Sequence, residues 1–224
     1  SLVFVPNTQP DQIPELNSFL EEWGMSVGSG VMFELSTDHL YNNTTPFWSA
    51  AEYVDEDYSS VITNKSIPVS VMQSRPIEIL KESESIKVLL ESTENSGIYP
   101  VDAAEGWQPE ESDLTGPITL AAVSTKQVSG VDDVSNVAVV GSAAAFASSL
   151  LSSTSVNNSA YFINMFNTLA EREDTVLIEA KTLGGATMSV TTNVSIPLGV
   201  VFTIVLPLLI LVTGLVIWIR RRNR

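Results

Sequence analysis

Residues 135–142 read SNVAVVGS, and residues 143–151 continue as AAAFASSLL. The run 137–140 is apolar at every position, a pattern typical of a strand that is covered on both faces of a sheet. Gly141 supplies a turn, and the small residues after it predict a helix over 143–151. This stretch therefore predicts a strand, a turn and a helix of an α/β domain.

The segments around this unit continue the alternation of strands and helices. After a polar run at 152–159, a second helix is predicted, with Phe162, Met165, Phe166 and Leu169 on one face. Further strands are predicted at 2–5, 27–35, 69–72, 87–91, 118–123 and 175–180, a helix at 13–23, and polar loops at 36–66 and 92–116. Strands that alternate with helices favour a Rossmann-like α/β fold with a mostly parallel sheet.

The end of the chain predicts a membrane anchor. Residues 197–219, PLGVVFTIVLPLLILVTGLVIWI, are uncharged and as a helix would span roughly 35 Å, more than the hydrocarbon core of about 30 Å. Trp218 is placed as an interfacial aromatic, and Pro207 predicts a kink in mid-span. The anchor residues that we single out are Pro197, Leu206, Pro207, Trp218 and Ile219.

A basic cluster gives this anchor an orientation. All 26 acidic residues lie at or before Glu179, whereas the last residues include Arg220, Arg221, Arg222 and Arg224. By the positive-inside tendency these arginines are the topology signal that places the C-terminus in the cytoplasm. The expected division is an extracytoplasmic domain at 1–181, a polar stem at 182–196, a transmembrane helix at 197–219 and a basic cytoplasmic tail at 220–224. Because a strand-like run follows Ser1 at once, we expect the domain to be incomplete at its N-terminus and the chain to derive from a longer one.

Composition excludes several classes of function. The net charge of −15 argues against nucleic acid as a partner, because phosphate binding needs a basic face. Without cysteine the chain forms no disulfide framework, zinc–thiolate site or thiol nucleophile. His39 is the only histidine and is expected at the surface, and Ser142 is expected to cap the helix after Gly141. Neither a G-x-S-x-G motif nor a phosphate-binding loop occurs, so the sequence predicts no catalytic residue, cofactor or metal ligand.

Two further residue types leave an alternative open. The carboxylates, as at 55–57 and 110–113, lack the spacing of a calcium-binding EF-hand loop and predict a solvated acidic surface. Asparagine sequons occur at Asn42, Asn43, Asn64, Asn157 and Asn193 and keep open a glycosylated surface protein. The absence of cysteine argues against that alternative, because small secreted domains usually contain disulfides.

The order of several stretches resembles the C-terminal half of the GldG-type auxiliary proteins of ABC transporters, a family first described with gliding motility. The stretches are SNVAVVGS at 135–142, FASS at 146–149, NSAYFINMFNTLAERED at 158–174, TVLIEAK at 175–181 and LPLLILVTGLVIWIRRR at 206–222. The start of the chain is similar to the family's P-x-L-x-x-x-L-x-x-x-G pattern through Pro14, Leu16, Leu20 and Gly24. Leu89, Leu90, Ser92 and Thr93 correspond to its leucine-leucine-x-threonine/serine strand end.

This resemblance implies an extracytoplasmic domain that is held in the bilayer beside an ABC permease and its ATPase. It implies a non-catalytic auxiliary subunit of a bacterial export or gliding-type system that contacts permease loops, cargo or a second copy of itself. One departure is that residues 142–145 lack the acidic residue that such proteins often carry after the glycine. Two alternatives stay open, a surface binding or adhesion domain unrelated to transport, and a tethered hydrolase-like domain whose site lies in a missing N-terminal part.

Overall fold

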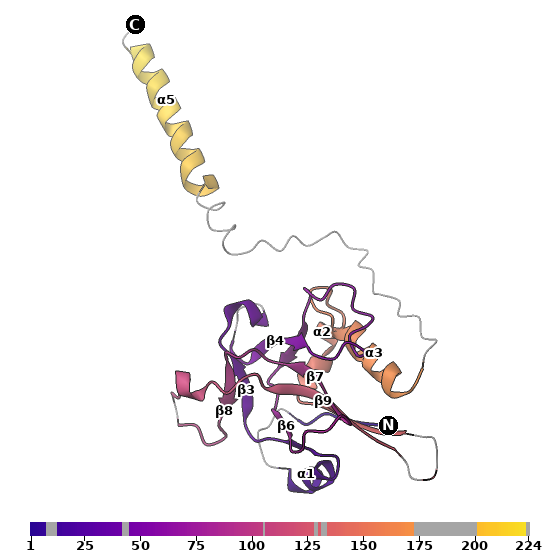
Figure 1. The fold of residues 1–224 in the computed structure, drawn as a ribbon. Helices are drawn as coiled ribbons and strands as arrows, with labels where there is room; N and C mark the ends of the chain where they lie inside the picture. The colour runs from indigo at the N-terminus through magenta and orange to yellow at the C-terminus, as the bar shows by residue number, and fades with distance from the viewer. Residues whose placement is uncertain are drawn as a thin grey trace. The chain divides into compact units, whose positions relative to one another are not determined.

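The computed structural model describes residues 1–7, 13–41, 45–104, 106–127, 130, 134–172 and 201–222 (Figure 1). The chain divides into two compact units, Ser1–Ala180 and Lys181–Arg224, each of which is described by itself. The strand expected at 175–180, the stem at 182–196 and the residues Pro197 and Arg224 lie outside the described residues.

The described part of the first unit is rich in short strands. Its elements are β1 (Leu2–Phe4), α1 (Pro14–Glu21), β2 (Met25–Val27), β3 (Val31–Glu34), the 3-10 turn η1 (Thr37–His39), β4 (Trp48–Tyr53), β5 (Val69–Met72), β6 (Ile77–Ile79), β7 (Ile86–Glu91), β8 (Ser96–Tyr99), η3 (Glu111–Asp113), β9 (Thr119–Gln127), β10 (Val134–Val140), η4 (Ala143–Phe146), α2 (Ser148–Leu151) and α3 (Asn158–Leu169).

Six of these strands form one sheet in the order β1-β10-β9-β7-β4-β5. In that sheet, β1 is parallel to β10, and the other described neighbours pair antiparallel. The expectation of a mostly parallel, Rossmann-like sheet is therefore wrong. The physical reason is visible between β9 and β10, because residues 128–133 are too few for the crossover that parallel neighbours require. Two pairs, β2-β6 and β3-β8, form small antiparallel sheets beside the main one.

The two expected polar loops contain strands that the sequence pattern conceals. Within 36–66, β4 lies in the main sheet and buries Ser49, Ala50 and Ala51, whose small side chains give no clear alternation of apolar and polar residues. Within 92–116, β8 pairs with β3. The expected helix over 143–151 is also shorter, because Ala147 has an extended backbone that separates η4 from the single turn of α2.

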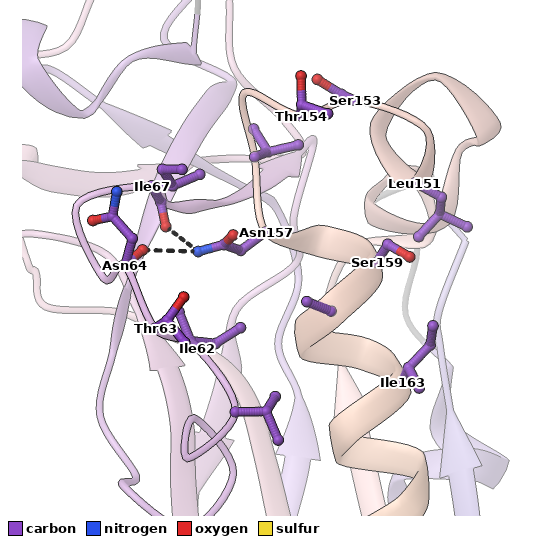
Figure 2. Close-up of a pocket in the computed structure, with 13 residues that line it drawn as sticks. Ile62, Thr63, Asn64, Ile67, Leu151, Ser153, Thr154, Asn157, Ser159 and Ile163 are labelled. Carbon is purple, nitrogen blue, oxygen red and sulfur yellow. Dashed lines mark hydrogen bonds between the residues drawn. The ribbon is translucent and has the colours of Figure 1, made fainter. Parts of the chain in front are cut away.

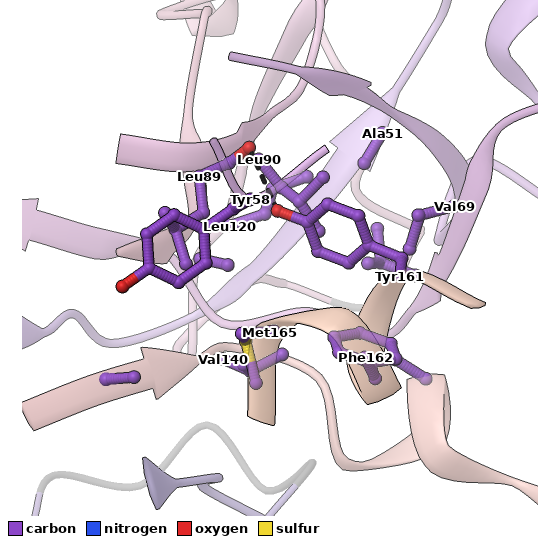
Figure 3. Packing of buried hydrophobic residues seen from close by; sticks show 14 of the residues in the cluster. Ala51, Tyr58, Val69, Leu89, Leu90, Leu120, Val140, Tyr161, Phe162 and Met165 are labelled. Atoms are coloured by element: carbon purple, nitrogen blue, oxygen red, sulfur yellow. Dashed lines mark hydrogen bonds between the residues drawn. The ribbon is translucent and has the colours of Figure 1, made fainter. Parts of the chain in front are cut away.

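The main sheet is covered on both faces, as the apolar run at 137–140 predicts. Ala138 and Val140 belong to a core cluster that includes side chains of α3, whereas Val137 and Val139 belong to a second cluster that includes Leu20 of α1. This alternation follows from the two-residue period of a strand. Figure 3 shows the first cluster, in which Tyr161, Phe162 and Met165 of α3 lie near residues of the sheet such as Leu90, Leu120 and Val140.

Polar side chains close the outer edge of β5. The Asn158 side chain accepts a hydrogen bond from the Ser70 N–H at 2.8 Å and donates to the Ser70 carbonyl at 2.8 Å and the Ala145 carbonyl at 2.9 Å. Two residues further along β5, the Met72 carbonyl accepts a hydrogen bond from the Ser142 hydroxyl at 2.6 Å. The same hydroxyl accepts from the Met72 N–H at 3.2 Å. These side chains replace a neighbouring strand and leave this edge of the sheet without free backbone groups at Ser70 and Met72.

The described part of the second unit is a single helical segment. A π-helical turn, η5 (Val201–Val205), leads into α5 (Leu206–Arg222), and the change of hydrogen-bond pattern falls next to Pro207, which has no N–H to donate. The stretch Phe202–Arg222 is long and apolar enough to cross a membrane. Near its end, the guanidinium of Arg222 lies over the Trp218 ring at 5.5 Å. The helix thus continues past Ile219 and includes Arg220, Arg221 and Arg222.

We expect Asn158→Ala to destabilise the domain by about 3 kcal/mol, because three buried backbone groups would lose their partner. The measurement is urea unfolding of the full chain in mild detergent, followed by near-ultraviolet circular dichroism. Asn95→Ala, at an exposed position, is the matched control and should change stability by less than about 0.5 kcal/mol. A similar small loss for Asn158→Ala would show that its side chain does not hold the β5 edge.

Candidate functional site

A cleft of about 340 Å³ lies between the turn at 61–67 and the segment that carries α2 and the start of α3 (Figure 2). Its aliphatic lining comprises Val61, Ile62, Ile67, Leu151, Val156, Ala160 and Ile163, and its polar lining comprises Thr63, Asn64, Ser153, Thr154, Asn157 and Ser159. None of these residues is charged. We call this the neutral cleft.

Asn157 ties the two walls of the neutral cleft together. Its side-chain amide nitrogen donates to the Asn64 carbonyl at 3.1 Å, the Ile67 carbonyl at 2.7 Å and the Tyr53 hydroxyl at 3.0 Å, and Figure 2 shows the first two bonds. The Tyr53 hydroxyl donates in turn to the Ile67 carbonyl at 2.8 Å, and burial raises the pKa of Tyr53. The cleft is therefore held by a hydrogen-bonded network between β4, the turn and α3.

The two sequon asparagines of the neutral cleft, Asn157 and Asn64, differ in how accessible their side-chain amides are to a glycan. The two hydrogens of the Asn157 amide nitrogen face three acceptors, so a glycan there would replace a donating hydrogen and disrupt the network. Asn64 is exposed, and its side-chain oxygen accepts from the Ser66 N–H at 3.0 Å. The sequons at Asn42, Asn43 and Asn193 lie outside the described residues.

The sequence predicted that the carboxylates at 55–57 are solvated, but in the structure this holds only for some of them. Lys87 Nζ lies 3.2 Å from a carboxylate oxygen of Asp55 and 2.7 Å from one of Asp57, and the hydrogen bond to Asp57 raises the pKa of Lys87. The other Asp55 oxygen accepts from the Tyr58 N–H at 3.1 Å, and only 16% of the Asp55 side chain is exposed. This ion pair fixes the chain after β4 to β7, just before the turn that lines the neutral cleft.

A second hollow, of about 500 Å³, is lined in part by Asp38, His39, Glu52, Glu56 and Lys65. His39 was expected at the surface, and about one third of its side chain is exposed, with Nε2 3.3 Å from Glu52 Oε1. Its Nδ1 lies 3.3 Å from the Ser36 hydroxyl. These three residue types could suggest a hydrolytic triad, but the Ser36 contact closes the η1 turn, where the His39 N–H donates to the Ser36 carbonyl. We therefore assign no catalysis to them.

Ser142 caps the turn after Gly141, as predicted. It is fully buried, and besides its bonds to Met72 its hydroxyl accepts from the Ala145 N–H at 3.2 Å. Two charged residues are buried, Arg75 and Glu34, and their burial was not predicted from the sequence. Arg75 donates twice to the Gly28 carbonyl, and Glu34 accepts from Thr93 and from the Ser36 N–H. Both join separate segments of the chain, and neither lines the neutral cleft.

Among the described residues, no group of three or more histidine, aspartate or glutamate side chains could hold a metal ion. The residues of the neutral cleft were missed as a site because their types carry no chemical signal. The sequence identifies Asn157 and Asn64 only as parts of sequons, and nothing in it indicates that the two residues are hydrogen-bonded.

Comparison with known proteins gives little further information. No protein-family model and no curated protein sequence matches the chain. Among solved structures, one described as "mmIFT52 N-terminal domain" is similar, with 16% identity and a TM-score of 0.48. The match covers 72% of this chain and 60% of that one. A similarity at this level assigns neither a family nor a function to the chain.

The neighbouring carboxyl groups of Glu52 and Glu91 yield a prediction about pH. Glu52 of β4 is paired with Glu91 of β7, and burial, assisted by the charge of Glu52, raises the pKa of Glu91. The folded protein thus favours the neutral carboxyl group. The neutral Glu91 side chain contributes fully to stability below the ordinary glutamate pKa of about 4.3. This contribution is lost as the pH rises through the raised pKa of Glu91 in the folded protein.

We expect Glu91→Gln to raise the midpoint of thermal unfolding at pH 7 by about 1–2 °C, because the glutamine has no charge to bury. The gain should vanish below about pH 4, where Glu91 itself is neutral. The measurement is thermal unfolding of the full chain from pH 3.5 to pH 8, with the exposed Glu94→Gln as control. A gain that persists at low pH would show that the effect is not due to ionisation of Glu91.

Proposed function

We propose that this chain is a membrane-anchored, non-catalytic domain that binds a partner protein outside the cytoplasm. The observation that carries the proposal is the helix Phe202–Arg222, which is apolar along its length and ends in Arg220, Arg221 and Arg222. A helix of this length and composition is typical of a membrane span, and arginines at its end are typical of the cytoplasmic side. The first unit, which holds all 26 acidic residues, would then lie on the other side of the membrane.

For the partner, we propose an ABC permease together with its ATPase, in a bacterial transport, export or gliding-type system. Support comes from the resemblance of the segments at 135–142, 158–174 and 206–222 to the GldG-type auxiliary proteins. The chain itself has no Walker A sequence, so ATP hydrolysis would take place in another polypeptide. The role of the domain would be to scaffold, by contact with permease loops, cargo or a second copy.

A second candidate is a glycosylated surface binding or adhesion protein. The observation that favours it is Asn64, an exposed asparagine in an intact sequon. A loss of mass on treatment with a peptide N-glycosidase, abolished by Asn64→Gln, would support this candidate over the transport subunit.

The absence of native cysteine permits a direct test of membrane topology. We expect a single cysteine introduced as Glu110→Cys, at an exposed position, to react with a membrane-impermeant maleimide on intact cells. A single cysteine introduced as Asn223→Cys should react only after the cells are permeabilised. Labelling of both or neither in intact cells, with the protein present in the membrane fraction, would contradict the proposed orientation.

The proposed partners can be tested in native membranes. We expect chemical crosslinking of the full-length protein, purification through a C-terminal tag and mass spectrometry to recover an ABC ATPase and a multi-span permease in constant ratio. An unrelated single-span protein with the same tag is the control. Recovery of neither subunit with intact and abundant bait would remove the transport function and leave the adhesion candidate.

A further inference from the structure

We propose that the neutral cleft binds an uncharged segment of the partner protein and receives an aliphatic side chain between α3 and the turn at 61–67. This inference rests on the proposed function, in which the first unit contacts a partner outside the membrane. Three features of the cleft support it, namely its size and apolar base, the chemistry of its polar residues, and its lack of charge.

The size and the apolar residues of the cleft fit a side chain of a peptide. A volume of about 340 Å³ lies at the lower end of ligand pockets, which hold roughly 300–1,000 Å³. Ile62 and Val156 are buried, whereas 47% of Ile163 is exposed. Burial of such exposed apolar surface by a partner is favourable.

The polar residues of the cleft suit a peptide backbone. Thr63, Thr154 and Ser159 offer hydroxyl groups, each able to donate and accept, which is what the N–H and C=O groups of an extended segment require. The Asn157 amide is already committed to the network, so it shapes the cleft rather than supplying a donor. No aromatic ring lines the cleft, and a stacking platform for a sugar or a base is therefore missing.

The charge pattern selects an uncharged segment. The chain has a net charge of −15, and the neighbouring hollow contains Asp38, Glu52 and Glu56, the last of which pairs with Lys65, yet the neutral cleft has no charged lining residue. A lysine or arginine that entered it would lose hydration without gaining a partner, and an acidic side chain would also be repelled by the surrounding acids. Complementarity is therefore best for a segment without charge.

The apolar surface also continues beyond the cleft along α3. Ile163 and Phe166 are three residues apart, on one side of the helix, and are 47% and 44% exposed. The ring centroid of Phe146 is 6.3 Å from that of Phe166. A peptide seated in the cleft could therefore cover both exposed side chains and bury more area than the cleft alone provides.

The test is a titration of the isotope-labelled full chain in lipid nanodiscs with three blocked tripeptides, observed by NMR. We expect N-acetyl-Leu-Ala-Leu amide to shift the backbone resonances of Thr63, Asn64, Ser159 and Ala160. The Glu-Ala-Glu and Lys-Ala-Lys analogues should bind at least about ten-fold more weakly, which corresponds to about 1.4 kcal/mol. Equal shifts with all three peptides, or shifts elsewhere only, would overturn the proposal.

Two matched variants separate the cleft from general effects. Ser159→Glu introduces a charge into the cleft, in the first turn of α3, where an acidic residue favours the helix. Ser149→Glu makes the same change at an exposed position in α2 that does not line the cleft. We expect Ser159→Glu to weaken binding of the Leu-Ala-Leu peptide at least about ten-fold and Ser149→Glu to leave it unchanged. Unchanged binding in Ser159→Glu would show that the peptide binds elsewhere.

The titration and the crosslinking together distinguish the two proposals. If the aliphatic peptide binds in the neutral cleft but crosslinking in native membranes recovers no transport subunits, the cleft assignment stands and the transport function fails. If the subunits are recovered equally with the wild type and with Ser159→Glu, and the peptide produces no shifts, the cleft assignment fails and the anchored-subunit function stands.

Discussion

The outer edge of β5 is the constraint on which much of the domain depends. A sheet edge must pair, be covered or face water, and here the segment after β10 covers it with side chains. The Ser142 side chain hydrogen-bonds the backbone of Met72, and the Asn158 side chain hydrogen-bonds the backbone of Ser70. Because these bonds fix both ends of the segment 142–158, they also fix where α3 begins and which of its residues face the sheet.

The neutral cleft follows from this arrangement. Asn157 directly precedes Asn158, and while the Asn158 amide binds β5, the Asn157 amide binds the turn at 61–67. The chain that leads to this turn is bound to β7 by the ion pair of Asp55 with Lys87. Both walls of the cleft are thus attached to the main sheet, and a ligand would meet a site that is already formed. Binding to such a site avoids much of the entropy cost of ordering loops.

The sequence predicted segments better than it predicted their pairing. The apolar run at 137–140, the helix α3 and the apolar C-terminal helix all have strong local patterns, and the structure contains each of them. The predicted strand direction was wrong because the alternation of strands and helices is typical of parallel sheets, whereas the short connection at 128–133 permits only antiparallel neighbours. β4 was missed because its buried residues are serine and alanine. The neutral cleft could not be predicted, since it depends on contacts such as that between Asn157 and Asn64, which are far apart in the sequence.

The acidity of the domain and the neutrality of the cleft have different consequences for recognition. The acidic surface acts over about 10 Å at moderate salt, repelling acidic chains and bringing basic ones closer. The cleft acts only on contact, through packing on Ile62 and Val156 and hydrogen bonds to its hydroxyl groups. Added salt should therefore slow the encounter with a basic partner while hardly changing how tightly an uncharged segment is held, because screening weakens charge interactions and not burial. A partner that satisfies both surfaces carries an uncharged segment on an otherwise basic face.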